Sequence, residues 1–237
     1  MGVGNIEVKE MFLDSVRYPS KDWTKVIVLG FLSLFPLIGI STGPFWLLFL
    51  ILAFIPVGYL FRILKITFEG SDELPNFNGW RELFSDGFKV FIVALIYAIP
   101  IVIISIIPFI GQPSSISISI LSAQTLWGIS TSNVQITILI LISLIGFIGL
   151  ANMALYDGDV HAAFNFREIF KRISMIGWRK YAVFYIIIWI LGLLTMLISF
   201  LAFTLILGII LVPLLIGPYF AILGARFLAL IFASSES

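Results

Sequence analysis

Three residues that could bind a metal ion lie close together at 157–161, where the sequence reads Asp157-Gly158-Asp159-Val160-His161. Carboxylate and imidazole groups at this spacing can hold a divalent cation that also contacts a lipid phosphate. The same residues fit a simpler arrangement, in which the chain turns at Gly158 and Asp159 caps the helix that follows. We therefore predict no metal site and no cofactor. An enzyme acting on lipid headgroups through Asp157, Asp159 and His161 is the least favoured hypothesis.

The composition excludes several other kinds of site. The 237 residues include no cysteine, so disulfides and thiolate metal sites are excluded, and the single histidine excludes a multi-histidine site. The formal net charge is +1, which leaves no surplus of cations to neutralise a run of phosphates. We expect no nucleic-acid partner, and we predict that the protein is not an enzyme.

The hydrophobic content points to the membrane. Hydrophobic residues make up 60% of the chain and charged residues 11%, whereas soluble proteins average about 45–50% and about 25%. Three blocks, at 26–61, 90–156 and 181–225, contain no charged residue. Each is long enough for two crossings of about 20 residues. The sequence therefore predicts an all-α integral membrane protein with six transmembrane helices arranged as three hairpins.

The breaks inside these blocks place the six spans. We predict them at about 23–40, 44–66, 87–110, 134–156, 178–200 and 204–226. All 14 Lys and Arg residues then fall on one side of the membrane. Positive residues in short loops mark the cytoplasmic side, so we expect both termini to be cytoplasmic and the protein to lie in the cytoplasmic membrane.

The expected organisation is a single membrane domain, 1–237, in which an amphipathic segment precedes each hairpin. Its parts are an N-terminal helix (1–18), hairpin one (19–66), a cytoplasmic interfacial segment (67–86), hairpin two (87–156, with an outer loop at 111–133), a cytoplasmic interfacial helix (157–177), and hairpin three with the tail (178–237). The outer stretch at 113–132 alternates Ser and Ile near its start, which indicates a short strand or an extended interfacial segment.

A repeated phrase supports the internal repeat. The sequence reads FNGWRELF at 77–84 and FNFREIF at 164–170, and each phrase precedes a predicted span. Apolar residues recur three and four positions apart in both, as in a helix with one apolar face. A helix with aromatic residues on one face and basic residues on the other lies in the membrane interface. Asn165 and Glu168 also resemble an N-terminal capping pair.

These segments have two possible roles, which the sequence leaves open. They either only position the next spans, or they also bind lipid headgroups or a cytoplasmic partner. The candidate lipid or partner contacts are Trp80, Arg81, Lys89, Arg167, Lys171, Arg172, Trp178 and Arg179. A second candidate surface is the stripe of Gly217, Ala221 and Ala225 in the last span, which suits close helix packing, either internal or in a homo-oligomer. We favour internal packing there.

Prolines interrupt several predicted spans. We favour the interpretation that they only shape the bundle, but they also allow an alternative function. Broken helices can expose backbone carbonyls to a substrate, which would suit a small-molecule permease or channel. The six prolines in question are Pro36, Pro56, Pro100, Pro108, Pro213 and Pro218. No ionisable residue lies at the predicted middle of the membrane, where coupled carriers usually place one. This absence weakens the permease hypothesis.

The segments RYPSKDW, ELPNFNGWRELFSDGFK and AFNFREIF resemble an uncharacterised family of polytopic membrane proteins, mainly archaeal with bacterial members, that is classed as a domain of unknown function. The resemblance implies a six-span membrane protein and brings no activity or cofactor. We therefore predict a non-enzymatic membrane protein that organises lipid or a partner complex through its cytoplasmic interfacial helices. The expected partners are membrane lipids and either a membrane-protein partner or a second copy of the chain.

Overall fold

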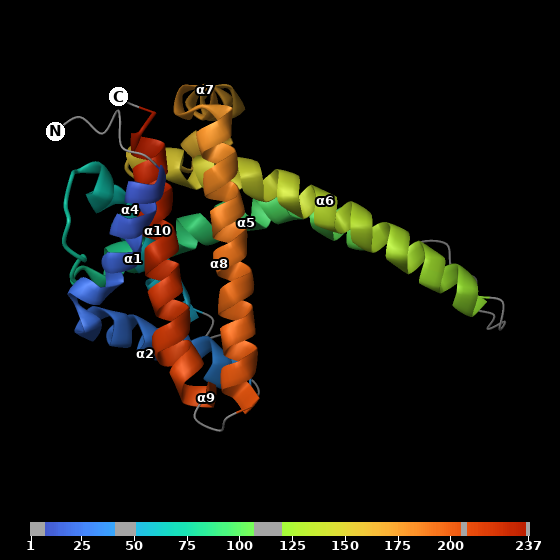
Figure 1. The fold of residues 1–237 in the computed structure, drawn as a ribbon, viewed down its shortest axis with the longest axis horizontal. Coiled ribbons are helices and arrows are strands. Elements are labelled where there is room, and N and C mark those ends of the chain that lie inside the picture. Colours follow the sequence, from blue (N-terminus) through green and yellow to red (C-terminus); the bar gives the residue numbers. More distant parts are fainter. Residues whose placement is uncertain (1–7, 41–50, 107–119, 205–207, 236–237) are drawn as a thin grey trace.

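The computed structural model describes residues 8–40, 51–106, 120–204 and 208–235, and all elements within these ranges are helices (Figure 1). The α-helices are α1 (Val8–Arg17), α2 (Trp23–Ile40), α4 (Phe54–Phe68), α5 (Trp80–Ile106), α6 (Ile120–Leu155), α7 (Phe166–Ile176), α8 (Trp178–Thr204), α9 (Gly208–Leu211) and α10 (Gly217–Ala233). Short turns of other helix types are η2 (Pro19–Lys21), η5 (Val160–Phe164) and the π-helical η6 (Val212–Ile216).

Among the described residues, four helical segments are long and apolar enough to cross a membrane. They are Trp80–Ile106, Val134–Leu155, Trp178–Ala202 and Val212–Ala233, with mean hydropathies between 2.0 and 2.6. The protein is therefore a multi-pass, all-helical membrane protein. Helix α2 coincides with the first predicted span. Residues 44–50 of the second predicted span lie outside the described residues, so six spans and their hairpin arrangement stay predictions.

The phrase at 77–84 does not form a separate interfacial helix, so that part of the prediction is wrong. Helix α5 begins at Trp80 and continues without a break to Ile106. The left-handed backbone at Gly79, with a φ of 68°, ends the preceding loop. At the predicted start of the span, Gly87 disfavours the helix by only about 1 kcal/mol relative to alanine. That cost is too small to end a helix that packs along α4.

The second hairpin also differs from the prediction. Helix α6 begins at Ile120, so the expected strand or extended segment is wrong for residues 120–132, and residues 113–119 lie outside the described ranges. Ser and Thr each lower helix propensity by only tenths of a kcal/mol, and no proline lies between Pro113 and Pro213. At 36 residues, α6 is about 54 Å long, which exceeds the roughly 30 Å hydrocarbon core. The outer position of its beginning stays a prediction.

The last span was predicted to end at 226, but α10 continues to Ala233. Arg226 therefore lies inside a helix, and its charge is satisfied there by neighbouring side chains and a carbonyl. Helix η6 contains Pro213, whose missing N–H favours a local π-helical turn. Pro100 lies within α5 without ending it.

Helices α8 and α10 form an antiparallel pair, and helices α5 and α6 form a second pair that diverges from it. Helices α8 and α10 run side by side, α7 lies across one end of α8, and α1 packs against α10 (Figure 1). Helices α5 and α6 extend away from this pair toward the lower right of Figure 1. One buried core cluster joins α1 to α8 and α10 through Met11, Phe184 and Phe227, and a second joins α2 to α4 through Leu29 and Ile63.

Helices α4 and α5 approach each other closely at a pair of glycines. A Cβ at Gly58 would lie 1.8 Å from the Leu83 carbonyl oxygen, and one at Gly87 would lie 1.8 Å from the Phe54 carbonyl oxygen. Neither position can hold a larger residue unless the helices move apart. At Gly217 a Cβ would meet only the Val212 carbonyl oxygen, within the same chain segment and at 3.4 Å. Close helix approach at Gly217 is therefore not confirmed.

Candidate functional site

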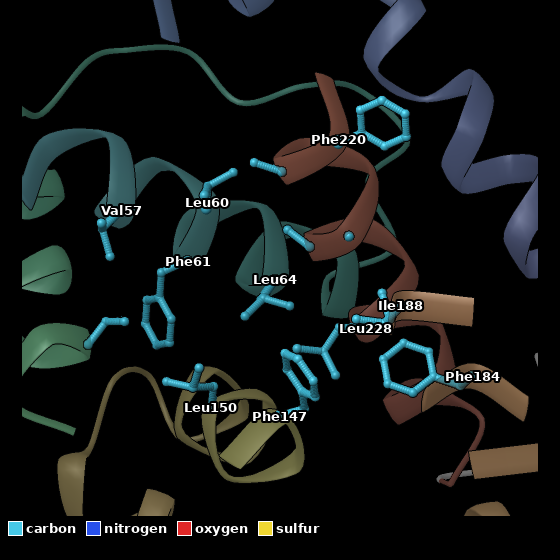
Figure 2. A pocket seen from close by; sticks show the side chains of 14 residues that line it. Val57, Leu60, Phe61, Leu64, Phe147, Leu150, Phe184, Ile188, Phe220 and Leu228 are labelled. Carbon is cyan, nitrogen blue, oxygen red and sulfur yellow. The ribbon is translucent and has the colours of Figure 1, made fainter. Parts of the chain in front are cut away.

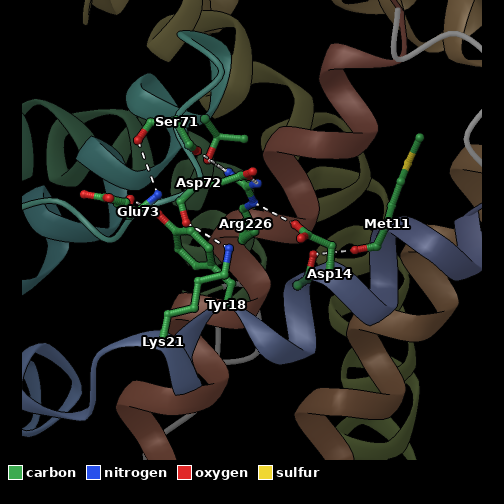
Figure 3. Close-up of polar contacts among 10 residues, drawn as sticks. Met11, Asp14, Tyr18, Lys21, Ser71, Asp72, Glu73 and Arg226 are labelled. Atoms are coloured by element: carbon green, nitrogen blue, oxygen red, sulfur yellow. Dashed lines mark hydrogen bonds and ion pairs between the residues drawn. The ribbon is translucent and has the colours of Figure 1, made fainter. Parts of the chain in front are cut away.

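Arg226 joins segments that are far apart in the sequence (Figure 3). It is 4% exposed, and its guanidinium Nε donates to Asp14 Oδ2 at 3.0 Å. Its Nη1 donates to Thr67 Oγ1 at 3.1 Å and to the Ser71 carbonyl at 2.7 Å, while Nη2 pairs with Asp72. One buried cation thus holds α1 and the loop after α4 against α10.

Tyr18 lies directly under this guanidinium. The Arg226 guanidinium carbon is 4.6 Å from the centre of the Tyr18 ring, a cation–π contact. The Tyr18 hydroxyl donates to the Glu73 carbonyl at 2.8 Å, and Lys21 Nζ donates to the Asp72 carbonyl at 2.9 Å (Figure 3). Burial raises the pKa of the Tyr18 phenol to about 12. The phenol therefore stays neutral and remains a donor.

A second charged cluster surrounds Lys65 of α4. Its Nζ lies 3.2 Å from Asp86 Oδ2 of α5 and 3.1 Å from Asp157 Oδ1, just beyond α6. The hydrogen bond from Lys65 and its charge lower the pKa of Asp157. Lys89 lies in the same cluster, half-buried, and within the described chain it has no hydrogen-bond or ion-pair partner. The charge of Lys89 also lowers the pKa of Asp157, so Lys89 acts on that carboxylate without a direct ion pair.

The segment at 157–161 forms the turn and cap that the sequence predicted. Gly158 has a φ of 82°, and Asp159 Oδ1 accepts a hydrogen bond from the His161 backbone N–H at 3.0 Å at the start of η5. Asp157 is engaged by Lys65 instead. Both carboxylates thus have structural partners, and within the described ranges no three metal-binding side chains gather.

Together these contacts define the charged face, comprising residues 8–25, 62–89, 157–180 and 226–235. Arg226 links the first, second and fourth segments, Lys65 links the second to the third, and Arg172 links the third to the fourth by donating to Ser235 Oγ at 3.4 Å. The four segments in which the sequence collects its charges are therefore mutually connected.

Helix α7 carries an exposed amphipathic surface on this face. Ile169, Ile173 and Ile176 are buried, while Phe166 and Phe170 are 48% and 46% exposed. The basic side chains of the same helix, Arg167 and Lys171, are also exposed. At its start, Asn165 Oδ1 accepts from the Glu168 N–H at 3.3 Å and Nδ2 donates to Glu168 Oε2 at 3.2 Å, which confirms the predicted capping pair.

The predicted lipid or partner contacts do not all have the same environment. Six of them are exposed: Trp80, Arg81, Arg167, Lys171, Trp178 and Arg179. Lys89 is half-buried. Arg172 is used inside the protein, because it pairs with Glu168 at 3.7 Å and lies 5.2 Å from the centre of the Phe232 ring. Arg172 is thus a structural residue of the charged face rather than an open contact.

The two repeated phrases adopt different structures despite their similar letters. The phrase at 77–84 leads directly into α5, whereas the phrase at 164–170 leads into α7, which ends at Ile176 and is followed by the C-cap residue Gly177. Gly177 has a φ of 90°, a conformation that glycine adopts easily, and α8 starts at the next residue. In both phrases one apolar residue is buried, Leu83 in the first and Ile169 in the second, and an aromatic neighbour stays exposed.

An apolar cleft, here called the central cleft, lies between α4, α5, α6, α8 and α10 (Figure 2). Its volume is about 300 Å³. The lining residues are all apolar: Val57, Leu60, Phe61, Leu64, Val90, Phe147, Leu150, Phe184, Ile188, Phe220, Ala221, Gly224, Ala225 and Leu228. Ala221 and Ala225, which were predicted to pack against a helix, therefore line this cleft.

A second apolar cleft, the α5–α6 cleft, adjoins the first. It has a volume of about 260 Å³ and runs along α5 from Val93 to Ile101. Phe147 and Leu150 of α6 line both clefts. Among the described residues that line the second cleft, Tyr97 and Ser143 have the only polar side chains. The Tyr97 hydroxyl donates to the Ala163 carbonyl, and the Ser143 hydroxyl donates to the Ile140 carbonyl and is hydrogen-bonded to the Tyr185 hydroxyl.

Sequence reasoning missed the structural role of Arg226 and the presence of both clefts. The signal for Arg226 was its isolation, because it is the one charged residue between Lys180 and Glu236. The clefts had no comparable signal, because they depend on how far α5 and α6 diverge from α8 and α10.

Residues 45–204 match the family model described as "Protein of unknown function (DUF4013)". The chain belongs to this family. The DUF4013 match includes both repeated phrases and the walls of the central cleft from α4, α5, α6 and α8. Helices α1 and α10, with Asp14 and Arg226, lie outside it, whereas Thr67, Ser71 and Asp72 of the Arg226 cluster lie inside. No curated protein and no solved structure matches the chain. The distribution that the sequence resemblance implied, mainly archaeal, stays a prediction.

Proposed function

We infer that this DUF4013 protein is a non-enzymatic protein of the cytoplasmic membrane that organises membrane lipid through its charged face. The observation that carries this proposal is the surface of α7, where exposed Phe166 and Phe170 adjoin exposed Arg167 and Lys171. Aromatic rings favour the headgroup level, and each Lys or Arg near an anionic leaflet contributes about 1 kcal/mol of attraction.

The beginning of α5 and the junction of α7 with α8 extend the same surface chemistry. Trp80 and Trp178 are 50% and 56% exposed, and each is followed by an exposed arginine, Arg81 or Arg179. A tryptophan beside an arginine suits the boundary between hydrocarbon and headgroups. These positions therefore support lipid contact, which is one of the roles that the sequence left open for them.

The proposed topology has six spans with both termini in the cytoplasm. It is supported by the contacts among the four charged segments, because segments joined by ion pairs must lie on the same side of the membrane. It is also supported by the positive-inside distribution of all 14 Lys and Arg residues.

A permease or channel for polar solutes has less support. The central cleft is lined by apolar side chains alone, and the two hydroxyls of the α5–α6 cleft are engaged by protein groups. A polar solute would lose its hydration in such clefts without gaining hydrogen bonds. A protein partner on the charged face is the remaining alternative, and the experiment below distinguishes it from lipid.

The proposal is tested by a pair of double variants that remove equal charge. Arg167→Gln/Lys171→Gln changes the α7 surface, and Lys9→Gln/Arg17→Gln removes two exposed cations from α1. After gentle purification, lipid and protein that co-purify are identified by mass spectrometry. We expect the α7 variant to lose most of its anionic phospholipid and the α1 variant to retain it. Equal lipid in both variants, or selective loss of a protein instead, would contradict the lipid role.

A further inference from the structure

The central cleft is suited to hydrocarbon rather than to water or a polar ligand. None of its lining side chains offers a hydrogen bond, and a buried water molecule needs two to four polar partners. Phe61, Leu64 and Phe147 point toward one another across it from α4 and α6 (Figure 2). Its volume of about 300 Å³ lies in the range of small-molecule sites, which in helix bundles occur between helices.

The two clefts together have the length of one membrane leaflet. Along α5, their lining begins at Val90 in the central cleft and ends at Ile101 in the α5–α6 cleft. These eleven residue steps correspond to about 16 Å. Half of the hydrocarbon core is about 15 Å. The lining from Val90 to Ile101 therefore has about the length of one lipid chain in a leaflet.

The two clefts begin at Val90, and this end of their lining is next to the charged face. Lys65 Nζ lies 5.3 Å from the centre of the Phe61 ring, and that ring lines the central cleft. Lys89 directly precedes Val90 and has no ion-pair partner in the described chain, whereas Lys65 already pairs with Asp86 and Asp157. Lys89 therefore places a cation without a direct ion pair next to the end of the central cleft at Val90.

We propose that the central cleft binds one hydrocarbon chain of a membrane phospholipid whose phosphate contacts Lys89. This inference deepens the proposed function and rests on it, since it names the lipid class and the place where one molecule is held. The bound chain would fill space that α4, α5, α6, α8 and α10 leave between them. The lipid would then be a constituent of the folded bundle rather than part of its surrounding annulus.

The chain offers a matched pair of glycines for testing the cleft. Gly224 lines it, and a Cβ there would meet only Ile188 Cδ1, at 4.0 Å, so Gly224→Leu can fill the cleft without a clash. Gly192 of α8 is exposed and has no atom within 4 Å of an added Cβ, so Gly192→Leu is the control. The probe is a phosphatidylglycerol with a photoactivatable group in one chain, incorporated into nanodiscs. Crosslinked peptides are mapped by mass spectrometry.

The expected result is crosslinking at Leu150, Phe184 or Leu228 in wild type and Gly192→Leu, reduced about fivefold or more in Gly224→Leu. Unchanged crosslinking in a folded Gly224→Leu variant would overturn the proposal. So would crosslinks confined to lipid-facing residues of α8 such as Leu193 and Met196. Melting temperatures of both variants verify that they are folded.

A second arm tests the phosphate contact. Diacylglycerol with the same labelled chains lacks the phosphate, and we expect it to crosslink more weakly than the phospholipid. Lys89→Gln should reduce crosslinking of the phospholipid to the level of the diacylglycerol. If the phospholipid still crosslinked more strongly than the diacylglycerol by the same factor, the role of Lys89 would be overturned. The α7 variant Arg167→Gln/Lys171→Gln separates the two proposals, because it removes annular lipid contacts and leaves the cleft intact. If crosslinking in the cleft is lost in Gly224→Leu but retained in the α7 variant, the result supports a lipid bound in the cleft.

Discussion

The guanidinium Nε of Arg226 and the carboxylate Oδ2 of Asp14 lie 3.0 Å apart and join the last long helix to the first across 212 residues of sequence. Around this pair, Phe12 of α1 contacts Phe227 of α10 with ring centres 5.6 Å apart, and Met11 is buried. Helix α1 was predicted as an amphipathic segment, and it is one, but its apolar side packs on α10. The N-terminal helix therefore belongs to the folded core.

The first prediction is that Arg226→Gln destabilises the protein by about 2–3 kcal/mol. The change removes two charge-assisted hydrogen bonds to carboxylates and leaves the Thr67 hydroxyl and Ser71 carbonyl without their donor. The free energy of unfolding is measured by reversible titration with SDS in mixed micelles. Proteolysis should also reach α1 sooner, because its main polar attachment is lost.

Arg179→Gln is the control for this change. Arg179 is exposed and has no ion-pair or hydrogen-bond partner among the described residues, so its loss should change stability by less than about 0.5 kcal/mol. A similar unfolding free energy for Arg226→Gln and wild type would show that the cluster does not hold α1 in place.

The second prediction concerns the pH dependence that Tyr18 introduces. Its phenol has a folded-state pKa of about 12, against about 10 in an unfolded chain. The stabilisation is therefore fully present below pH 10 and is lost as the pH rises through 12. Between these values, Tyr18 should add a loss of up to about 1.4 kcal/mol per pH unit.

The Tyr18→Phe variant isolates this contribution. Phenylalanine cannot donate to the Glu73 carbonyl, so the variant should be less stable at neutral pH and lose less stability between pH 10 and 12. SDS titration at each pH provides the measurement. Parallel curves for the variant and wild type would assign the alkaline loss to other groups.

Much of the helical content could be predicted because hydrophobic blocks and charge positions are local properties of the sequence. The start of α8 at Trp178 and the cap at Asn165 are examples, since each depends on a few neighbouring residues. The start of α5 and the end of α10 were missed for a different reason. Helix α5 includes Gly87 because it packs against α4 there. Helix α10 continues past Arg226 because neighbouring acceptors satisfy the charge of that residue.

The sequence predicted which kinds of residue lie on the charged face, but not which of them are exposed and which hold the protein together. Trp80, Arg81, Arg167 and Lys171 are exposed, as a contact surface requires. The sequence could not show that Arg172 points toward the protein and its neighbour Lys171 toward the surroundings. Which of two adjacent basic side chains on α7 points inward depends on where the core lies, and the local sequence does not contain that information. Of the partners of Arg172, Glu168 is four residues away in the sequence, whereas Phe232 and Ser235 are 60 and 63 residues away.

The third prediction is that Gly58→Ala and Gly87→Ala each destabilise the protein by about 2 kcal/mol or more. The added methyl would overlap the backbone carbonyl of Leu83 or Phe54, at 1.8 Å, so α4 and α5 must separate. Gly192→Ala in α8 is the control and should be neutral or slightly stabilising, because alanine favours a helix and nothing obstructs it. A comparison of SDS titrations suffices, and equal stability of all three variants would contradict the close packing.

The fourth prediction distinguishes the two carboxylates that Lys65 contacts at nearly equal distances. Asp86 has 12% of its side chain exposed and Asp157 has 98%. Water screens an exposed pair far more than a buried one, so Asp157→Asn should cost less than about 0.5 kcal/mol and Asp86→Asn about 1–3 kcal/mol. Double-mutant cycles with Lys65→Met measure each coupling. Equal coupling energies would show that burial does not separate the two pairs.

The fifth prediction tests the six-span topology by labelling single cysteines, which is direct because the chain has none of its own. Asn76→Cys and Ser174→Cys alter exposed side chains of the charged face, and Ser117→Cys lies in the predicted outer loop. A membrane-impermeant maleimide added to intact cells should react at 117 alone, and at 76 and 174 only after the membrane is opened. All three positions should react after solubilisation, which controls for accessibility. Reaction at 76 in intact cells would place the α4–α5 connection outside, and the ion pairs of Lys65 and Arg226 would then require the whole charged face to be outside as well.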